Sequence, residues 1–171
     1  HGLDRVLLSL EPHNNGPGFA FDVVERHTRP DNRLYGGAAA ASVLAVVEAV
    51  TGRSTVWSTT QIVSAAQLGE RLVVMPSVVQ SGRTVSQVQV QGTVGDRLVF
   101  TAVAAAAAWP RQGLDSAWRT MPREVPPPAQ GEALRGLLPD GLANPGHFLA
   151  CEQRLVSVDD DARAGKMLVW A

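Results

Sequence analysis

The sequence predicts an α+β domain in which a curved antiparallel sheet wraps around one long, buried helix. Residues 38–50 consist of helix-forming residues with only Ser42 and Glu48 as polar side chains. A helix that is apolar on nearly every side must be covered by other structure. The segments that follow, up to residue 108, run apolar or alternate between apolar and polar residues, with turn signals between them. These segments are the strands that we expect to cover the helix.

Each element has its own local signal. Residues 19–25 are aromatic and β-branched, which favours a strand, and Arg29–Asn32 should break it. Gly36 and Gly37 open the helix, and Gly52 stands where a left-handed C-terminal cap belongs. After the helix we expect a meander of four consecutive strands, at residues 55–65, 71–79, 84–94 and 98–108. Within the third strand, Gln87, Gln89 and Gln91 alternate with valines, the pattern of a sheet with one wet face.

The 171 residues suffice for one ordinary globular domain. Composition divides the chain into four parts: a lead-in at residues 1–17, the domain at 18–108, a linker rich in proline and glycine at 109–150, and a strand-like tail at 151–171.

Composition excludes several classes of function. The 15 basic and 16 acidic residues give a net charge of −1, so we expect neither nucleic-acid binding nor electrostatic membrane binding. No apolar run reaches the ~18–20 residues of a membrane span, and no secretory signal is visible. The single cysteine, Cys151, allows no internal disulfide and fits a reducing, cytoplasmic setting. The four histidines, at positions 1, 13, 27 and 147, lack metal-site spacing, and Asp159–Asp161 lacks the rest of a calcium loop, so we expect no metal and no cofactor.

Four short motifs occur in an order that resembles a known family. They are Arg33-Leu34-Tyr35-Gly36-Gly37, Ser81-Gly82-Arg83-Thr84, Met121-Pro122 and Lys166-Met167-Leu168-Val169-Trp170. Together they resemble the N-terminal half of type II acyl-CoA thioesterases, which contain two hotdog domains. The resemblance implies a hotdog fold and hydrolysis of fatty acyl-CoA to a free fatty acid and CoA, as part of fatty acid metabolism. It also implies that residues 151–171 begin an incomplete second hotdog.

The resemblance assigns no catalytic residue to this chain. In the family the catalytic Asp, Thr or Ser, and Gln lie in the second hotdog, and Trp57 stands where many relatives have a histidine. Three positions are nevertheless candidates. The Gly37 amide at the helix start could stabilise an oxyanion, or the glycine could serve close packing. Asn32, like Asp31, could position or activate water, or cap the helix. Gln61 could reach a pocket at a domain interface, or face solvent.

Arg83 and Arg97 sit at predicted turns and could contact the phosphates of CoA, or be solvated. For the chain as a whole the main alternative is a non-enzymatic hotdog that binds acyl-CoA or acyl chains or scaffolds a partner. A further alternative is an enoyl-thioester hydratase, for which His27 would need an acidic partner. Residues 98–108 are apolar on both faces and residues 167–170 lack an obvious partner strand, so we expect association with a second hotdog or another copy.

Overall fold

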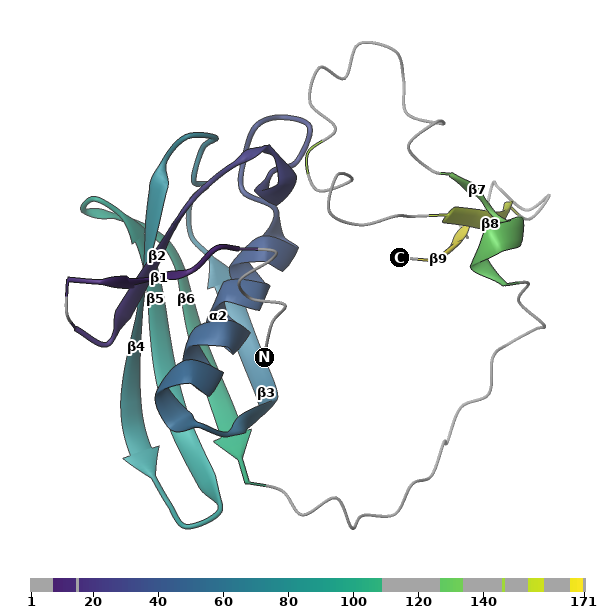
Figure 1. Cartoon of the computed structure of the whole chain (residues 1–171). Helices are drawn as coiled ribbons and strands as arrows, with labels where there is room; N and C mark the ends of the chain where they lie inside the picture. The colour runs from purple at the N-terminus through teal and green to yellow at the C-terminus, as the bar shows by residue number, and fades with distance from the viewer. Residues whose placement is uncertain are drawn as a thin grey trace.

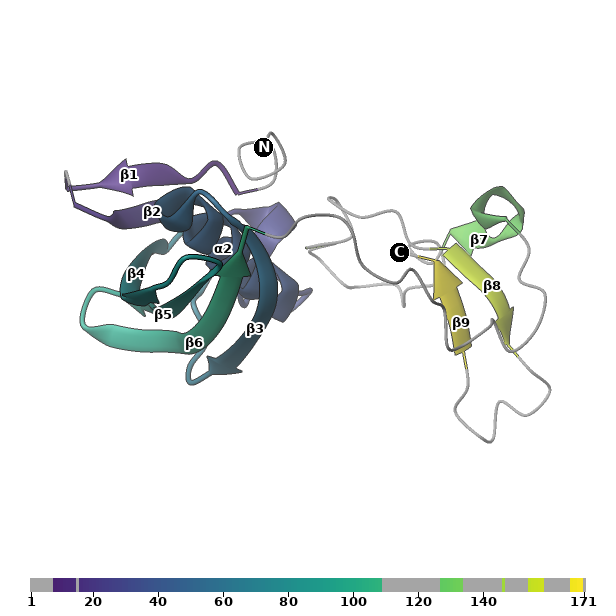
Figure 2. The same ribbon diagram turned by 90° about the horizontal axis from the view of Figure 1, so that it is seen from below.

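The computed structural model describes residues 8–14, 16–108, 127–133, 146, 154–158 and 167–170. Its main body is a six-stranded antiparallel sheet that curves around one helix, α2 (Gly36–Thr51) (Figures 1 and 2). In spatial order the strands are β1 (Glu11–His13), β2 (Gly18–Asp22), β4 (Arg71–Ser81), β5 (Val85–Val94), β6 (Arg97–Ala107) and β3 (Ser54–Ile62). A 3₁₀ turn, η1 (Glu25–His27), lies between β2 and the helix. This architecture confirms the predicted hotdog fold, and β1 comes from the predicted lead-in.

Helix α2 begins and ends where the glycines indicate. Gly52 has φ of +64°, and its N–H donates to the Glu48 carbonyl at 2.9 Å, so it forms the left-handed cap. One side of the helix is buried against the sheet, at Ala38, Ala39, Ser42, Val43, Val46 and Val47. Leu44 points away and is 40% exposed. The expectation of a helix covered on nearly every side is therefore wrong for the described residues, because the sheet covers only the side that it faces. Leu44→Ala should therefore cost less than the about 2–5 kcal/mol that is typical of a fully buried leucine.

The core lies between α2 and the concave face of the sheet. Phe21 and Phe100 are the largest fully buried side chains, and valines from α2, β4 and β5 fill the space between them. Gly92 lies opposite Phe100 across β5 and β6. A Cβ atom at Gly92 would fall 2.2 Å from Cε1 of Phe100. The glycine therefore makes room for the buried ring.

The strand order corrects the predicted four-strand meander. Of the four predicted strands, only β4, β5 and β6 are neighbours in sequence order, and β3 pairs with β6 at the opposite end of the sheet from β1 and β2. The reason is that the segment between β3 and β4 passes the start of the helix before it reaches the position beside β2. A hydrogen bond from the Leu34 N–H to the Ala66 carbonyl, at 2.8 Å, holds this segment next to the residues that precede the helix. The strand at residues 98–108 is paired on both sides, by β5 and β3, so among the described residues β3 carries the long free edge.

The other face of β3 to β6 points away from the helix; we call it the outer face. Two cross-strand rows define it: Gln91, Thr101 and Gln61, and Gln89, Val103 and Thr59. In β5 the glutamines are exposed while Ser86, Val88, Val90 and Gly92 are buried, which confirms the predicted wet face.

A second sheet has three antiparallel strands: β7 (Glu132–Ala133), β8 (Arg154–Val158) and β9 (Met167–Trp170), preceded by a 3₁₀ turn, η2 (Pro128–Gln130). Residues 167–170 therefore pair with β8, which corrects the expectation that they lack a partner in this half. Cys151, Met121–Pro122, Asp159–Asp161 and most of the predicted linker lie outside the described residues.

Candidate functional site

The start of α2 presents two adjacent backbone amides. Tyr35 is the N-terminal capping residue, and its carbonyl accepts the first helical hydrogen bonds, from Ala38 at 3.0 Å and Ala39 at 3.2 Å. The N–H groups of Gly36 and Gly37 precede these bonds, and they have no backbone acceptor among the described residues. Both glycines are exposed. The helix dipole makes this end attractive to negative charge, so these amides suit a polarised carbonyl or an oxyanion.

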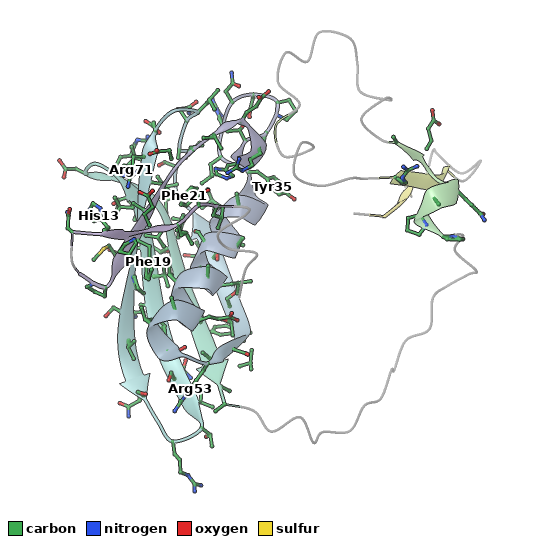
Figure 3. The ribbon with its side chains drawn as sticks, viewed as in Figure 1. His13, Phe19, Phe21, Tyr35, Arg53 and Arg71 are labelled. Atoms are coloured by element: carbon green, nitrogen blue, oxygen red, sulfur yellow. The ribbon has the colours of Figure 1, made fainter. Side chains whose placement is uncertain are left out.

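The ring of Tyr35 covers one side of this site. A Cβ atom on Gly37 would lie 2.3 Å from Cε1 of Tyr35, whereas one on Gly36 would meet nothing within 4 Å. The Tyr35 N–H donates to the His27 carbonyl at 2.8 Å, which fixes the backbone just before the helix. Gly37 therefore has a steric role, since it allows the Tyr35 ring to lie over the helix start. Figure 3 shows Tyr35 at this end of the helix. The sequence offered no signal for the placement of this ring.

Gly37→Ala should displace the Tyr35 ring, and Gly36→Ala should leave it in place. Tyr35 is the only tyrosine of the chain, so labelling tyrosine with ¹³C gives one set of ring resonances. We expect these resonances to shift in Gly37→Ala and to stay near their wild-type positions in Gly36→Ala. Equal shifts in both variants would show that the contact between the ring and Gly37 does not hold Tyr35.

Asp31 and Asn32 shape the turn before the helix and do not cap it. Asp31 forms an ion pair with Arg29 and accepts a hydrogen bond from the Arg33 N–H at 3.3 Å. The hydrogen bond from Arg29 is the main reason that the pKa of Asp31 is lowered, which makes it a weaker base. Asn32 adopts φ of +62°, a conformation that asparagine tolerates well. The expectation that either residue caps the helix is wrong, because the cap is Tyr35, three residues further along.

Arg97 forms hydrogen bonds with the segment between β3 and β4 (residues 63–70), which passes the start of the helix. Its guanidinium donates to both carboxylate oxygens of Glu70, at 2.7 and 2.6 Å, and to the Ala65 carbonyl at 2.6 Å. The Glu70 carboxylate also accepts a hydrogen bond from the Gln67 N–H at 2.7 Å. This hydrogen bond is the largest cause of the lowered pKa of Glu70, and the hydrogen bond from Arg97 is the second largest. Arg97 therefore has acidic and carbonyl partners within the chain, which makes it a poor candidate for CoA phosphates.

Gln61 and Gly37 are not brought together. Gln61 lies on the outer face beside Thr101, while α2 packs on the opposite face of the sheet. There it lines a shallow depression of about 330 Å³ with Thr59, Gln89 and Gln91.

His27 has a packing role: it is 1% exposed, and its ring packs edge-on against Phe21 with ring centroids 5.4 Å apart. Its Nδ1 accepts a hydrogen bond from the Val24 N–H at 3.3 Å.

Arg83 lies at the β4–β5 hairpin, at the other end of the helix from Gly37. Arg53, just after α2, donates to the carbonyls of Gly82 at 3.0 Å and Arg83 at 3.2 Å, and to the Ser86 hydroxyl at 3.0 Å. Figure 3 shows Arg53 at the end of α2 opposite to Tyr35. The 16 residues of α2 span about 24 Å. A ligand would have to extend along the helix to contact both Gly37 and Arg83.

The described residues hold no group of three or more His, Cys, Asp or Glu side chains that could bind a metal ion. Nowhere in the described part of the chain does a helix reach the length and hydropathy needed to cross a bilayer.

Comparison with solved structures shows which proteins share this fold. The chain is 28% identical to a protein from Novosphingobium aromaticivorans that is assigned as a thioesterase, with a TM-score of 0.71 over 88% of this chain and 59% of that one. Thioesterase superfamily member 2 of Mus musculus is 23% identical, with a TM-score of 0.57 over 62% of this chain and 86% of that one. A protein from Thermobifida fusca assigned as a thioesterase II is 16% identical, with a TM-score of 0.68 over 93% of this chain and 55% of that one. This chain thus spans little more than half the length of the two bacterial proteins.

A search of curated proteins gives no significant match. A family model described as the acyl-CoA thioesterase N-terminal domain matches residues 24–109. That range holds α2 and strands β3 to β6, and it makes up half of the chain. The chain therefore belongs to the acyl-CoA thioesterase N-terminal domain family.

Proposed function

We propose that this chain is the N-terminal hotdog half of an acyl-CoA thioesterase, which hydrolyses fatty acyl-CoA to a free fatty acid and CoA. The observation that carries the proposal is the pair of amides at Gly36 and Gly37 at the start of α2, which have no backbone acceptor among the described residues, in a chain of this family. Such donors suit the carbonyl oxygen of a thioester, on which negative charge develops during hydrolysis.

In the proposed reaction a water molecule adds to the thioester carbonyl, and a tetrahedral oxyanion forms. The C–S bond then breaks, and the CoA thiolate leaves and takes up a proton. This chain contributes amide donors and one wall of the acyl site, while a second hotdog supplies the groups that activate the water. Asp31 forms an ion pair with Arg29, and Gln61 lies on the opposite face of the sheet, so we assign neither of them to the activation of the water.

The same proposal includes the partner and the ligand contacts. The free edge of β3 pairs with a strand of a second hotdog or of another copy, and exposed Val56, Trp57 and Ile62 are covered there, burying at least ~1,000 Å² in total. Arg83 is the candidate contact for CoA phosphates. A reducing, cytoplasmic setting is also part of the proposal.

The test measures free CoA released from a panel of short-, medium- and long-chain acyl-CoA esters. We expect the 171-residue chain, with its mass confirmed, to stay at the uncatalysed rate, and the protein completed by a second hotdog to release CoA with turnover. Strong hydrolysis by the 171-residue chain would overturn the assignment as a non-catalytic half. A two-hotdog protein that binds acyl-CoA without turnover would instead support the binding or scaffolding alternative.

A further inference from the structure

One residue of the predicted linker makes a close contact with the hotdog domain. Gly146 is buried, and it lies against the backbone of Thr28 and Arg29, more than a hundred residues earlier in the chain. A Cβ atom on Gly146 would fall 2.2 Å from the Thr28 carbonyl oxygen and 3.0 Å from the Arg29 carbonyl carbon. Gly146 also adopts φ of +54°, a conformation that strains residues with a Cβ atom. The position therefore requires glycine for two independent reasons.

The backbone that Gly146 meets is held on both sides. Thr28 is fully buried, and its N–H and its hydroxyl both donate to the Glu25 carbonyl, at 3.0 and 2.7 Å. On its other side Thr28 forms a β-bridge with Leu34. Because the turn is fixed in this way, a side chain at residue 146 would displace Gly146 from the contact sooner than it would displace the turn.

The same turn carries the start of α2. His27, directly before Thr28, accepts a hydrogen bond from the Tyr35 N–H at 2.8 Å. Leu34, the bridge partner of Thr28, directly precedes Tyr35, which is the N-terminal cap of the helix. One hydrogen bond and one β-bridge thus join the residues beneath Gly146 to the residue whose ring lies beside the Gly36 and Gly37 amides.

We propose that Gly146 is a positioning residue for the helix-start site. The chain beyond the hotdog docks at Gly146 on the turn at Thr28–Arg29 and thereby holds the turn and Tyr35 in place. The docking also limits where the second sheet begins, since Arg154, the first residue of β8, follows Gly146 by eight residues. Eight residues span at most about 29 Å. The second hotdog, on whose presence this last consequence of the proposed function rests, therefore starts near the amides.

The test uses two residue types that occur once each in the chain. Tyr35 is the only tyrosine and Cys151 is the only cysteine, so ¹⁵N-tyrosine gives one amide resonance and a nitroxide spin label attaches at one position. In the 171-residue wild type we expect the label to broaden the Tyr35 resonance, with the ascorbate-reduced label as reference. Cys151 follows Gly146 by five residues, which span at most about 18 Å.

Gly146→Ala should abolish most of this broadening, because the new methyl group clashes with the Thr28 carbonyl. We also expect hydrogen exchange at the Tyr35 amide to become about 10-fold faster, since its bond to the His27 carbonyl opens more often once the turn is released. Gly95→Ala is the matched control. Gly95 has φ of +55°, but a Cβ atom there meets nothing within 4 Å, so this variant should keep both the broadening and the slow exchange.

Each other outcome contradicts a stated part of the proposal. A wild type without broadening would overturn the docking, and a Gly146→Ala chain that keeps the broadening would overturn the requirement for glycine. A Gly146→Ala chain that loses the broadening but exchanges at the wild-type rate would overturn the positioning role. None of these measurements involves acyl-CoA, so their failure is distinguishable from a failure of the proposed hydrolysis, which the release of CoA tests.

Discussion

Replacing Phe100 with alanine should lower the free energy of unfolding by about 3–5 kcal/mol. Phe100 is fully buried and lies at the centre of the core, between Gly92 of β5 and Ile62 of β3. Its own strand, β6, is paired on both sides, by β5 and β3, so its backbone is held and cannot readily collapse into the space that the ring leaves. Urea unfolding followed by circular dichroism measures the loss. Val103→Ala, in the same strand but 42% exposed, is the control and should cost much less.

Gly92 allows a second test of the same packing, in which a side chain is enlarged instead of truncated. Gly92→Ala places a methyl group 2.2 Å from the Phe100 ring, so it should destabilise by about 1–3 kcal/mol through overpacking. The double variant Gly92→Ala/Phe100→Ala should be more stable than the sum of the two losses predicts, because the new methyl group partly fills the cavity. Strict additivity would show that the ring and the glycine do not share this space.

The second large effect concerns the free edge of β3. Val56→Lys/Ile62→Lys should raise the dissociation constant for pairing at this edge by about 100-fold or more. When a partner strand pairs with β3 in antiparallel register, the new lysines either come close to like charges on the partner or are buried beneath it. Both side chains are more than half exposed, at 53% and 54%, so the hotdog itself should keep its stability. Light scattering over a dilution series, with thermal unfolding in parallel, gives both readouts.

Leu68→Lys/Val79→Lys is the matched control for the edge variant. These side chains are 44% and 58% exposed and lie away from β3, so the control adds equal charge and removes a similar apolar area. It should associate like the wild type. If the β3 variant also associates like the wild type, the edge is not the pairing surface and the proposed arrangement with a second hotdog is wrong.

Local sequence signals located the elements well but gave the wrong neighbours. Gly37 and Gly52 marked the helix ends, because Gly37 makes room for the Tyr35 ring and Gly52 adopts a positive φ. The place of β3 was missed because strand pairing depends on where the crossing segment at residues 63–70 leads, and that path is set by contacts with residues 32–34. A meander of neighbouring strands was the simplest reading of four successive strand signals.

The candidate site was only partly visible in the sequence. The Gly-Gly pair is a local motif, so its amides could be anticipated. The packing of Tyr35 over Gly37 depends on a side-chain direction, which periodicity does not contain. Likewise, the alternation of Gln87, Gln89 and Gln91 indicated a wet face, but only the strand register shows that this face continues across β3 and β6 without a charge.

The position of β3 also sets an order of events in folding. Strands β4, β5 and β6 are joined by short hairpins, so their contacts form between residues that are close in sequence. Pairing of β3 with β6 joins Ser54 to Ala107 and requires the whole intervening chain to be in place. Since closing a longer loop costs more entropy before any contact forms, we expect β3 to dock after the hairpins and to detach before them. The strand that carries the free edge is thus secured only after the hairpins of β4, β5 and β6, and a partner bound along it would slow unfolding more than it would speed folding.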